Sequence, residues 1–335
     1  MSENPAPSYK EALAAVSDVL HRYDRFILAG HVDPDPDSIC SLLALEWALT
    51  EMGKVAVAVS PDQPPPTLKF LPRQERIRRP HEVDPRDWQV LIVIDCDLPR
   101  SGAAAAWADQ VELVVNIDHH VTNSATAPVL LLNTEAAAAG EIIYHLIQEL
   151  GLSLPEETAI LLYTAILTDT GSFRFSNTNA RVLRIAADLV DKGADPAVIA
   201  SEMYDTRPWS YMQMLRRVLA TLDCSADGRI AWIILGEADL LEAGMRQEES
   251  EGLIQFPRMI QGVEVAILFR EVGPREVRVS FRSRNKVDVS RLAQSFGGGG
   301  HARAAGCTIK LPLAAACREV LTKTEAFLAE AAAGR

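Results

Sequence analysis

Two kinds of apolar pattern alternate along the first part of the chain. Apolar positions at helical spacing predict an amphipathic helix at 9–23 and a second helix at 38–53, where Gly53 would end it. Short runs rich in Val, Ile and Leu predict buried strands at 25–30, 54–60, 88–97 and 111–120. Strands of this kind that alternate with helices are typical of a parallel sheet covered on both faces. We therefore expect an α/β fold.

The pattern turns helical from about Ala136. Apolar spacing predicts three further helices, at 137–151, 155–171 and 179–193. A second block follows. It has strand-like runs at 228–236, 263–273 and 276–283, a short helix at 288–296, a glycine-rich loop at 297–306 and a closing helix after the loop. We predict three regions: a parallel-sheet domain over 1–190, a helical connector over 191–226 and a smaller α/β domain over 227–335.

Composition limits the classes of function. A hydrophobic content of 48% and a charged content of 23% are typical of a soluble globular protein. No apolar stretch approaches the ~20 residues of a membrane span, and the start of the chain does not resemble a secretory signal. Five cysteines without a C-x-x-C pair favour a reducing environment over a disulfide framework or a zinc–thiolate site. We expect a cytoplasmic protein without a membrane partner.

The charge of the chain bears on its ligands. A formal net charge of −12 argues against binding of long nucleic acid, because that affinity comes from many contacts between basic side chains and phosphates. A small anionic ligand stays compatible with this charge, since a local pocket or bound cations can reverse its sign locally.

Carboxylates and histidines follow the ends of apolar elements at four places. They are His31, Asp33, Asp35 and Asp37; Asp95 and Asp97; Asp118, His119 and His120; and Asp169. In open α/β sheets the carboxyl ends of the strands meet at the ligand-binding edge. Gathered carboxylates raise one another's pKa unless a cation neutralises them. Their number suits two divalent ions ~3.5–4 Å apart, and manganese, iron, cobalt and zinc are all compatible with such ligands.

Each of these four places also has a simpler explanation. His31 could lie in a surface turn formed by the D-P-D-P-D stretch, and Asp95 could cap the next helix. Asp169 could be an ordinary turn residue. The order of the four places, each at the end of an apolar run, favours one shared metal site over four independent turns.

These motifs carry a family resemblance. Four motifs of the chain resemble those of the DHH phosphoesterase superfamily. They are H-x-x-x-D-x-D, which contains His31, Asp35 and Asp37; Asp95 after a strand; D-H-H at 118–120; and T-D-T-G around Asp169. Residues 281–306, ending in GGGGHARAAG, resemble the second half of the DHH-associated C-terminal domain. With "NIDHH", "GEIIY" and "LTDTGSFRFSNT", the likeness is closest to the bacterial nano-RNase and phosphoadenosine-phosphate phosphatase group.

The resemblance implies a role for each motif residue. One metal would be held by His31 and Asp35, the other by Asp37, His119 and Asp169, with Asp95 bridging both. His120 would face the substrate as proton donor, and Asp118 would support the histidines. The reaction would be attack of hydroxide on phosphorus with two metals, usually manganese.

The first motif departs from the family pattern. Pro36 and Cys40 stand where glycine is common. Proline fixes φ and removes an N–H, so we expect the first loop to be stiffer or slightly reshaped, with its ligand types intact. Asp33 has no counterpart role, and we expect it to face solvent.

The resemblance also implies that the second domain binds the nucleotide in a cleft between the two domains. The candidate substrate-binding residues are Arg258, Arg282, Ser283, Gly298, Gly299, Gly300, His301 and Arg303. Glycines let the backbone N–H groups approach an anion, and arginine matches phosphate oxygens with two donors. An ordinary turn would also explain the glycines, and a surface salt bridge would explain Arg258.

We therefore expect a manganese-dependent hydrolase of very short oligoribonucleotides and linear dinucleotides such as pApA and pGpG. We expect it also to remove the 3′-phosphate of 3′-phosphoadenosine 5′-phosphate. Three alternatives stay open: a cyclic-dinucleotide phosphodiesterase, a pyrophosphatase or polyphosphatase, and a non-catalytic nucleotide-binding protein. The glycine-rich histidine loop at 297–306 counts against a pyrophosphatase. The sequence leaves the oligomeric state open, with a homodimer among the options.

Overall fold

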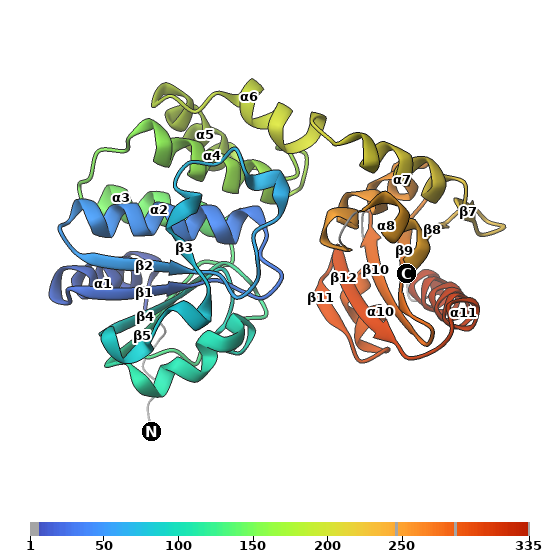
Figure 1. Cartoon of the computed structure of the whole chain (residues 1–335), viewed down its shortest axis with the longest axis horizontal. Helices are drawn as coiled ribbons and strands as arrows, with labels where there is room; N and C mark the ends of the chain where they lie inside the picture. Colours follow the sequence, from blue (N-terminus) through green and yellow to red (C-terminus); the bar gives the residue numbers. More distant parts are fainter. Residues whose placement is uncertain (1–6, 245–246, 285–286, 334–335) are drawn as a thin grey trace. The chain divides into compact units, whose positions relative to one another are not determined.

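The computed structural model describes residues 7–244, 247–284 and 287–333 (Figure 1). The chain divides into two compact units, Met1–Thr206 and Arg207–Arg335. The division falls inside the segment 191–226 that we predicted as a connector.

The first unit is built on a six-stranded parallel sheet, which confirms the predicted α/β class. Its strands are β1 (Arg25–Ala29), β2 (Val55–Val59), β3 (Ile77–Arg78), β4 (Val90–Ile94), β5 (Leu113–Asp118) and β6 (Val129–Leu132). Their order is β3-β2-β1-β4-β5-β6, and each neighbouring pair is parallel. The strand order reverses between β1 and β4, and in such sheets ligands bind at the carboxyl ends of the strands on either side of this point. The edge strands β3 and β6 were not predicted.

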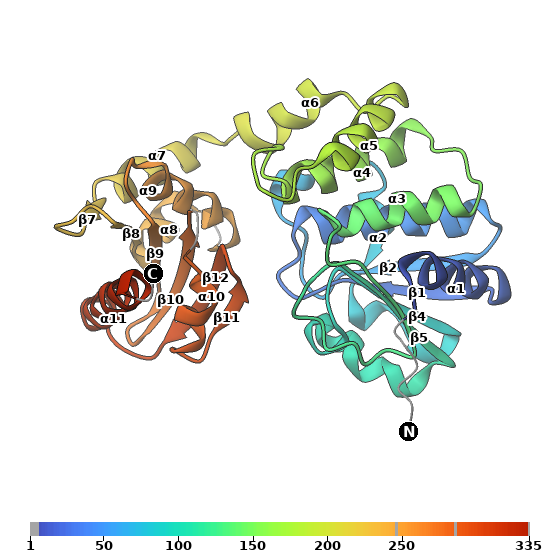
Figure 2. The same ribbon diagram turned by 180° about the vertical axis from the view of Figure 1, so that it is seen from behind.

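The α-helices of this unit are α1 (Tyr9–Arg22), α2 (Pro36–Glu51), α3 (Ala139–Glu149), α4 (Glu156–Asp169), α5 (Ala180–Asp191) and α6 (Pro196–Ala200). Side chains of β1 point alternately to the two faces of the sheet. Phe26 and Leu28 pack into the core formed with these helices, while Ile27 packs into a second cluster on the other face. Figures 1 and 2 show α2 and α3 together on one side of the sheet.

The second face of this sheet is covered differently. Its cluster is closed by Ala104 and Trp107, which lie in the 3₁₀ helix η5 (Leu98–Gln110). Both faces are therefore covered, as predicted, but the second face packs against a 3₁₀ helix. Shorter 3₁₀ and π turns occur at Pro66–Leu68, Gln74–Arg76, Pro80–Glu82, Pro85–Asp87 and Ser201–Asp205.

The second unit has a mixed six-stranded sheet in the order β11-β12-β10-β9-β8-β7. Its strands are β7 (Asp223–Cys224), β8 (Ile230–Leu235), β9 (Val265–Gly273), β10 (Glu276–Ser283), β11 (Gly299–His301) and β12 (Ala304–Ile309). Its helices are α7 (Trp209–Leu219), α8 (Glu237–Ala243), the 3₁₀ helix η7 (Gln247–Ile254), α9 (Gln255–Met259), α10 (Val289–Gln294) and α11 (Leu313–Ala333). Alternate residues of β9 face two cores, one with α10 and α11 and one with α7 to α9.

The segment 297–306, predicted as a loop, is partly a β-hairpin formed by β11 and β12. Two of its glycines are required by close packing. A Cβ on Gly298 would lie 2.1 Å from the carbonyl oxygen of Gly306, and one on Gly300, at φ 136°, would lie 2.6 Å from that of Ala304. Glycine-rich sequence is common to loops and tightly packed hairpins, so the pattern alone did not distinguish them.

Within the described ranges, no helix has both the length and the apolar character that crossing a membrane requires.

Candidate metal centre

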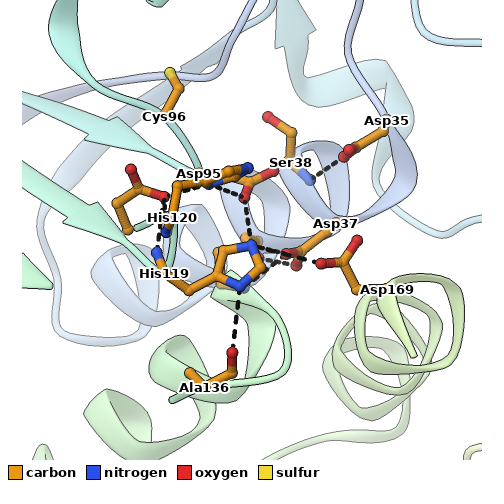
Figure 3. A network of polar contacts seen from close by, with 12 residues as sticks. Asp35, Asp37, Ser38, Asp95, Cys96, His119, His120, Ala136 and Asp169 are labelled. Atoms are coloured by element: carbon orange, nitrogen blue, oxygen red, sulfur yellow. Dashed lines mark hydrogen bonds and ion pairs between the residues drawn. The ribbon is translucent and has the colours of Figure 1, made fainter. Parts of the chain in front are cut away.

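The predicted ligands converge at the carboxyl edge of the first sheet, beside the point where the strand order reverses (Figure 3). His31 lies just beyond β1, Asp95 directly follows β4, and His119 directly follows β5. Two helices supply the remaining side chains. The N-cap and first turn of α2 contribute Asp35 and Asp37, and the last residue of α4 is Asp169.

Asp95 lies at the centre of the cluster and is 1% exposed. Its Oδ2 is 3.4 Å from Nε2 of His31, and its Oδ1 is 3.3 Å from Nε2 of His119. Neither oxygen makes a hydrogen bond to any residue in the described ranges. A buried carboxylate without hydrogen bonds is costly, so this arrangement suits a bound cation on each side.

Two sets of donor atoms flank Asp95. On one side, Nε2 of His31 lies 3.6 Å from Oδ2 of Asp35. On the other, Nε2 of His119 lies 3.5 Å from Oδ2 of Asp169 and 3.8 Å from Oδ2 of Asp37. In three groups the donor atoms lie within 4.8 Å of one another: His31, Asp35 and Asp95; Asp37, His119 and Asp169; and Asp95, His119 and His120. The structure thus brings all six predicted ligands together.

Backbone carbonyls orient the two histidines. Nδ1 of His31 lies 2.7 Å from the carbonyl oxygen of Val32, and Nδ1 of His119 lies 3.3 Å from that of Ala136. A carbonyl only accepts, so Nδ1 carries the hydrogen in each ring. Nε2, which faces the carboxylates, is then the nitrogen available to a metal.

Asp37 is completely buried and held by the N-terminus of α3. Its Oδ2 accepts a hydrogen bond from the backbone N–H of Ala139 at 2.6 Å, and its Oδ1 accepts one from Gly140 at 2.9 Å. The hydroxyl of Ser41 donates a third, at 3.1 Å. These contacts fix the carboxylate in one orientation, with its Oδ2 toward His119.

Asp118 holds His119 and His120 through hydrogen bonds. Its Oδ1 accepts hydrogen bonds from the backbone N–H of His119 at 2.7 Å and from Nδ1 of His120, also at 2.7 Å. Burial raises the pKa of Asp118, but the facing imidazole of His120 outweighs burial and holds this pKa below its usual range. The two histidine rings are inclined by 67°, so neighbouring residues present their nitrogens in different directions.

Two asparagines connect the ends of β4 and β5. The amide of Asn116, 2% exposed, donates to the carbonyl oxygens of Val93 and Cys96 at 3.0 and 2.7 Å. Asn123 in turn donates to Oδ1 of Asn116 at 2.8 Å. The bonded carbonyls flank Asp95, whose φ of 66° is a left-handed conformation that costs a non-glycine residue ~1–3 kcal/mol. Asn116 therefore stabilises the strained turn that presents Asp95.

The charges of the cluster depend on one another. Burial lowers the pKa of His31, but the facing carboxylates of Asp35 and Asp95 outweigh burial and raise it to about 11. The same balance, with Asp95 and Asp169, raises the pKa of His119 to about 11. Burial and the charge of Asp95 raise the pKa of Asp37 to about 7. Without metal, protons on the two histidines therefore balance the negative charge of the carboxylates. A bound cation would take over this role.

The cluster is open on one side. The side chain of Asp35 is 48% exposed and that of Asp169 is 29% exposed, whereas Asp37 and Asp95 are closed off. Pro36 is the first residue of α2, a position where proline suits the helix and its missing N–H is not needed. Asp35 caps this helix by accepting the N–H of Ser38 at 3.0 Å, and Cys40 is buried on it.

The substrate-binding residues predicted in the second unit have identifiable contacts within that unit. Ser283 is buried, and its hydroxyl donates to the carbonyl oxygens of Val287 and Ala302. Arg303 donates to the carbonyl of Val287 at 3.3 Å, and Arg258 donates to the side chain of Gln255 at 2.8 Å. Arg282, on β10, donates to the carbonyl of Phe281. The side chain of His301 lies outside the described part of the structure.

The groups that hold the candidate ligands were not predicted from the sequence. The buried Asn116 stood in the sequence as a polar residue inside an otherwise apolar run, which is a usable signal. The carbonyl of Ala136 and the N–H groups of Ala139 and Gly140 carry no such signal, because backbone groups are the same at every residue. Asp33 is exposed, as predicted, and its N–H donates to Asp62 at 2.9 Å.

Fold and site together define an α/β protein with a metal-capable centre of aspartates and histidines at the switch point of a parallel sheet. Residues 25–166 match the DHH family, N-terminal domain, and residues 230–330 match the DHHA1 domain. The chain belongs to the DHH family, as the resemblance predicted, and it is a phosphoesterase.

Its relatives make the similarity more specific. The chain is 36% identical over 307 residues, 91% of each protein, to the bifunctional oligoribonuclease and PAP phosphatase NrnA of Thermus thermophilus. It is 28% identical to the protein of the same name from Bacillus subtilis, over 86% of this chain and 90% of that one. A crystal structure of an exopolyphosphatase-related protein from Bacteroides fragilis has the same fold, with a TM-score of 0.88, 24% identity and 98% of each chain covered.

Proposed function

We propose that this protein hydrolyses very short oligoribonucleotides and linear dinucleotides to mononucleotides and converts 3′-phosphoadenosine 5′-phosphate to AMP. The arrangement of five candidate ligand side chains around a sixth, the buried Asp95, carries this proposal. It is supported by the similarity, along nine tenths of the chain, to a relative whose name states both activities.

The chemistry of the cluster fits two divalent ions, and manganese suits its mixture of imidazole and carboxylate donors. His31 and Asp35 would hold one ion, while Asp37, His119 and Asp169 would hold the other, with Asp95 shared. When bound, two such ions supply charge stabilisation at phosphorus and make water a stronger nucleophile near neutral pH.

His120 is the proposed proton donor to the leaving oxygen. Its Nδ1 hydrogen is held by Oδ1 of Asp118, a carboxylate kept ionised by this contact. Nε2, on the opposite side of the ring, is then the nitrogen that would transfer the proton. Asp118 acts in this scheme by fixing the orientation of the ring through this hydrogen bond.

The second unit is proposed to bind the nucleotide. Arg282, Arg303 and Arg258 supply fork-shaped donors suited to phosphate, and a Cβ added at Gly299 would meet open space. Replacement of Arg303 by Gln should raise KM by about tenfold and leave kcat nearly unchanged, since it removes binding made equally in ground and transition states.

A turnover panel tests the proposed substrates. Purified protein with manganese is offered pApA, pGpG, RNAs of two to five nucleotides, 3′-phosphoadenosine 5′-phosphate, cyclic di-AMP and pyrophosphate, and the D95N variant controls for contaminating nucleases. We expect turnover of the short linear substrates and of 3′-phosphoadenosine 5′-phosphate. Intact linear dinucleotides and short RNAs would contradict the proposal, and preferred cleavage of cyclic di-AMP or pyrophosphate would replace it.

A further inference from the structure

An alanine-rich segment, 135–141, carries contacts to three of the proposed metal ligands although its alanine side chains cannot bind metal. The carbonyl of Ala136 orients His119, as described above. The N–H groups of Ala139 and Gly140 hold Asp37. The segment thus connects ligands that come from β5 and α2.

The third ligand is connected through one side chain. The amide of Asn177 donates to the carbonyl oxygen of Ala137 at 3.2 Å and to that of Asp169 at 3.1 Å. A shift of this segment would therefore disturb His119, Asp37 and Asp169 together.

An ion pair between Glu141 and Arg181 holds the backbone of this segment. Glu141 is completely buried, and its Oε2 accepts the N–H of Ala137 at 2.8 Å. Its Oε1 accepts Nε–H of Arg181 at 2.5 Å, and Nη2 of the same arginine donates to the carbonyl of Glu135 at 2.8 Å. The pair therefore binds the backbone on both sides of Ala136. A buried carboxylate needs such a partner, since an unpaired charge in the interior is strongly unfavourable.

We propose that Glu141 and Arg181 are positioning residues of the metal centre. Their ion pair holds segment 135–141 in the conformation in which Ala136 aims Nε2 of His119 and α3 aims Asp37. Neither residue is among the proposed ligands or substrate contacts. This inference rests on the proposed metal centre. Loss of partners that orient metal ligands typically weakens metal binding by about 10–100-fold.

The same unit offers a matched control. Glu46 is also a buried glutamate, 2% exposed, and its Oε2 lies 2.6 Å from Nη2 of Arg73. Its described polar contacts are to Arg73, Arg76 and Thr50, none of which is a proposed ligand. E141Q and E46Q both remove a buried negative charge that faces arginine and preserve side-chain size.

The test measures manganese affinity of the full-length protein by titration calorimetry, at a temperature where circular dichroism shows each variant folded. We expect E141Q to bind manganese about 10–100-fold more weakly than wild type. E46Q should stay within about twofold, because none of the polar contacts described for Glu46 involves a proposed ligand, even where both variants lose similar thermal stability. Equal manganese affinities for E141Q and E46Q would overturn the proposal.

Arg181 provides a second route if E141Q does not fold, because its side chain is 40% exposed and its replacement should be tolerated. R181Q should weaken manganese binding in the same direction, and R181K should restore part of it by restoring the charge. Unchanged affinity of R181Q would overturn the positioning role alone. Wild-type protein that binds no manganese would overturn the metal centre and this inference with it. These experiments measure metal affinity and not turnover. Their outcome therefore does not depend on which substrate the protein hydrolyses.

Discussion

The candidate metal centre of the first unit and the glycine–arginine region of the second were predicted from motifs of similar clarity, but their surroundings differ. Around Asp95, buried carboxylates and imidazoles face one another without hydrogen bonds that satisfy Asp95. In the second unit, Gly298 and Gly300 are explained by close backbone packing, and Ser283 by two carbonyl acceptors. A buried carboxylate without a hydrogen-bond partner in the described structure, such as Asp95, indicates a ligand, whereas a motif explained by packing gives weaker evidence of one.

The largest expected effect separates the two adjacent histidines. H119N should lose most manganese affinity together with turnover. H120N should keep manganese affinity near that of wild type, because His120 is the proposed acid, while kcat falls by about 10²–10⁴-fold. Both variants are measured by calorimetry and by steady-state turnover of pApA. Equal loss of manganese affinity in the two variants would contradict the division of roles.

Manganese binding should strengthen as pH rises. The raised pKa values of His31 and His119, about 11 each, mean that both rings are protonated near neutral pH without metal. A metal takes the place of the Nε2 proton, so binding releases protons and affinity increases by up to about tenfold per pH unit for each proton released. Calorimetry in buffers of different ionisation enthalpy counts the protons. Release of none between pH 6 and 8 would contradict this charge state.

The smallest effect distinguishes structural from binding glycines in the second unit. G300A places a Cβ against the carbonyl of Ala304 at positive φ, and should destabilise that unit by about 1–3 kcal/mol. G299A meets open space and should leave stability nearly unchanged. Thermal unfolding measures both variants, and manganese affinity should stay at the wild-type value. A raised KM in G299A would support a ligand role for this backbone, whereas a large loss of stability would contradict the packing described here.

The sequence predicted the parallel sheet because buried strands β1, β4 and β5 are almost continuous apolar runs. It also predicted which carboxylates and imidazoles come together at the sheet edge, because the identity of an aspartate or histidine carries its chemistry. It did not predict β6, a four-residue strand too short to have a period, or the hairpin at 297–306, since glycine suits loop and hairpin alike. Nor did it predict the roles of Asn116, Glu141 and Arg181, which depend on contacts between residues distant in the chain.

Manganese titration of wild type and D95N tests whether Asp95 is shared by two metal positions. The amide of D95N preserves size but removes the charge that faces both His31 and His119. We expect two manganese ions per wild-type chain and loss of high-affinity binding at both positions in D95N, with the variant still folded by circular dichroism. Two ions bound by D95N with wild-type affinity would contradict this expectation.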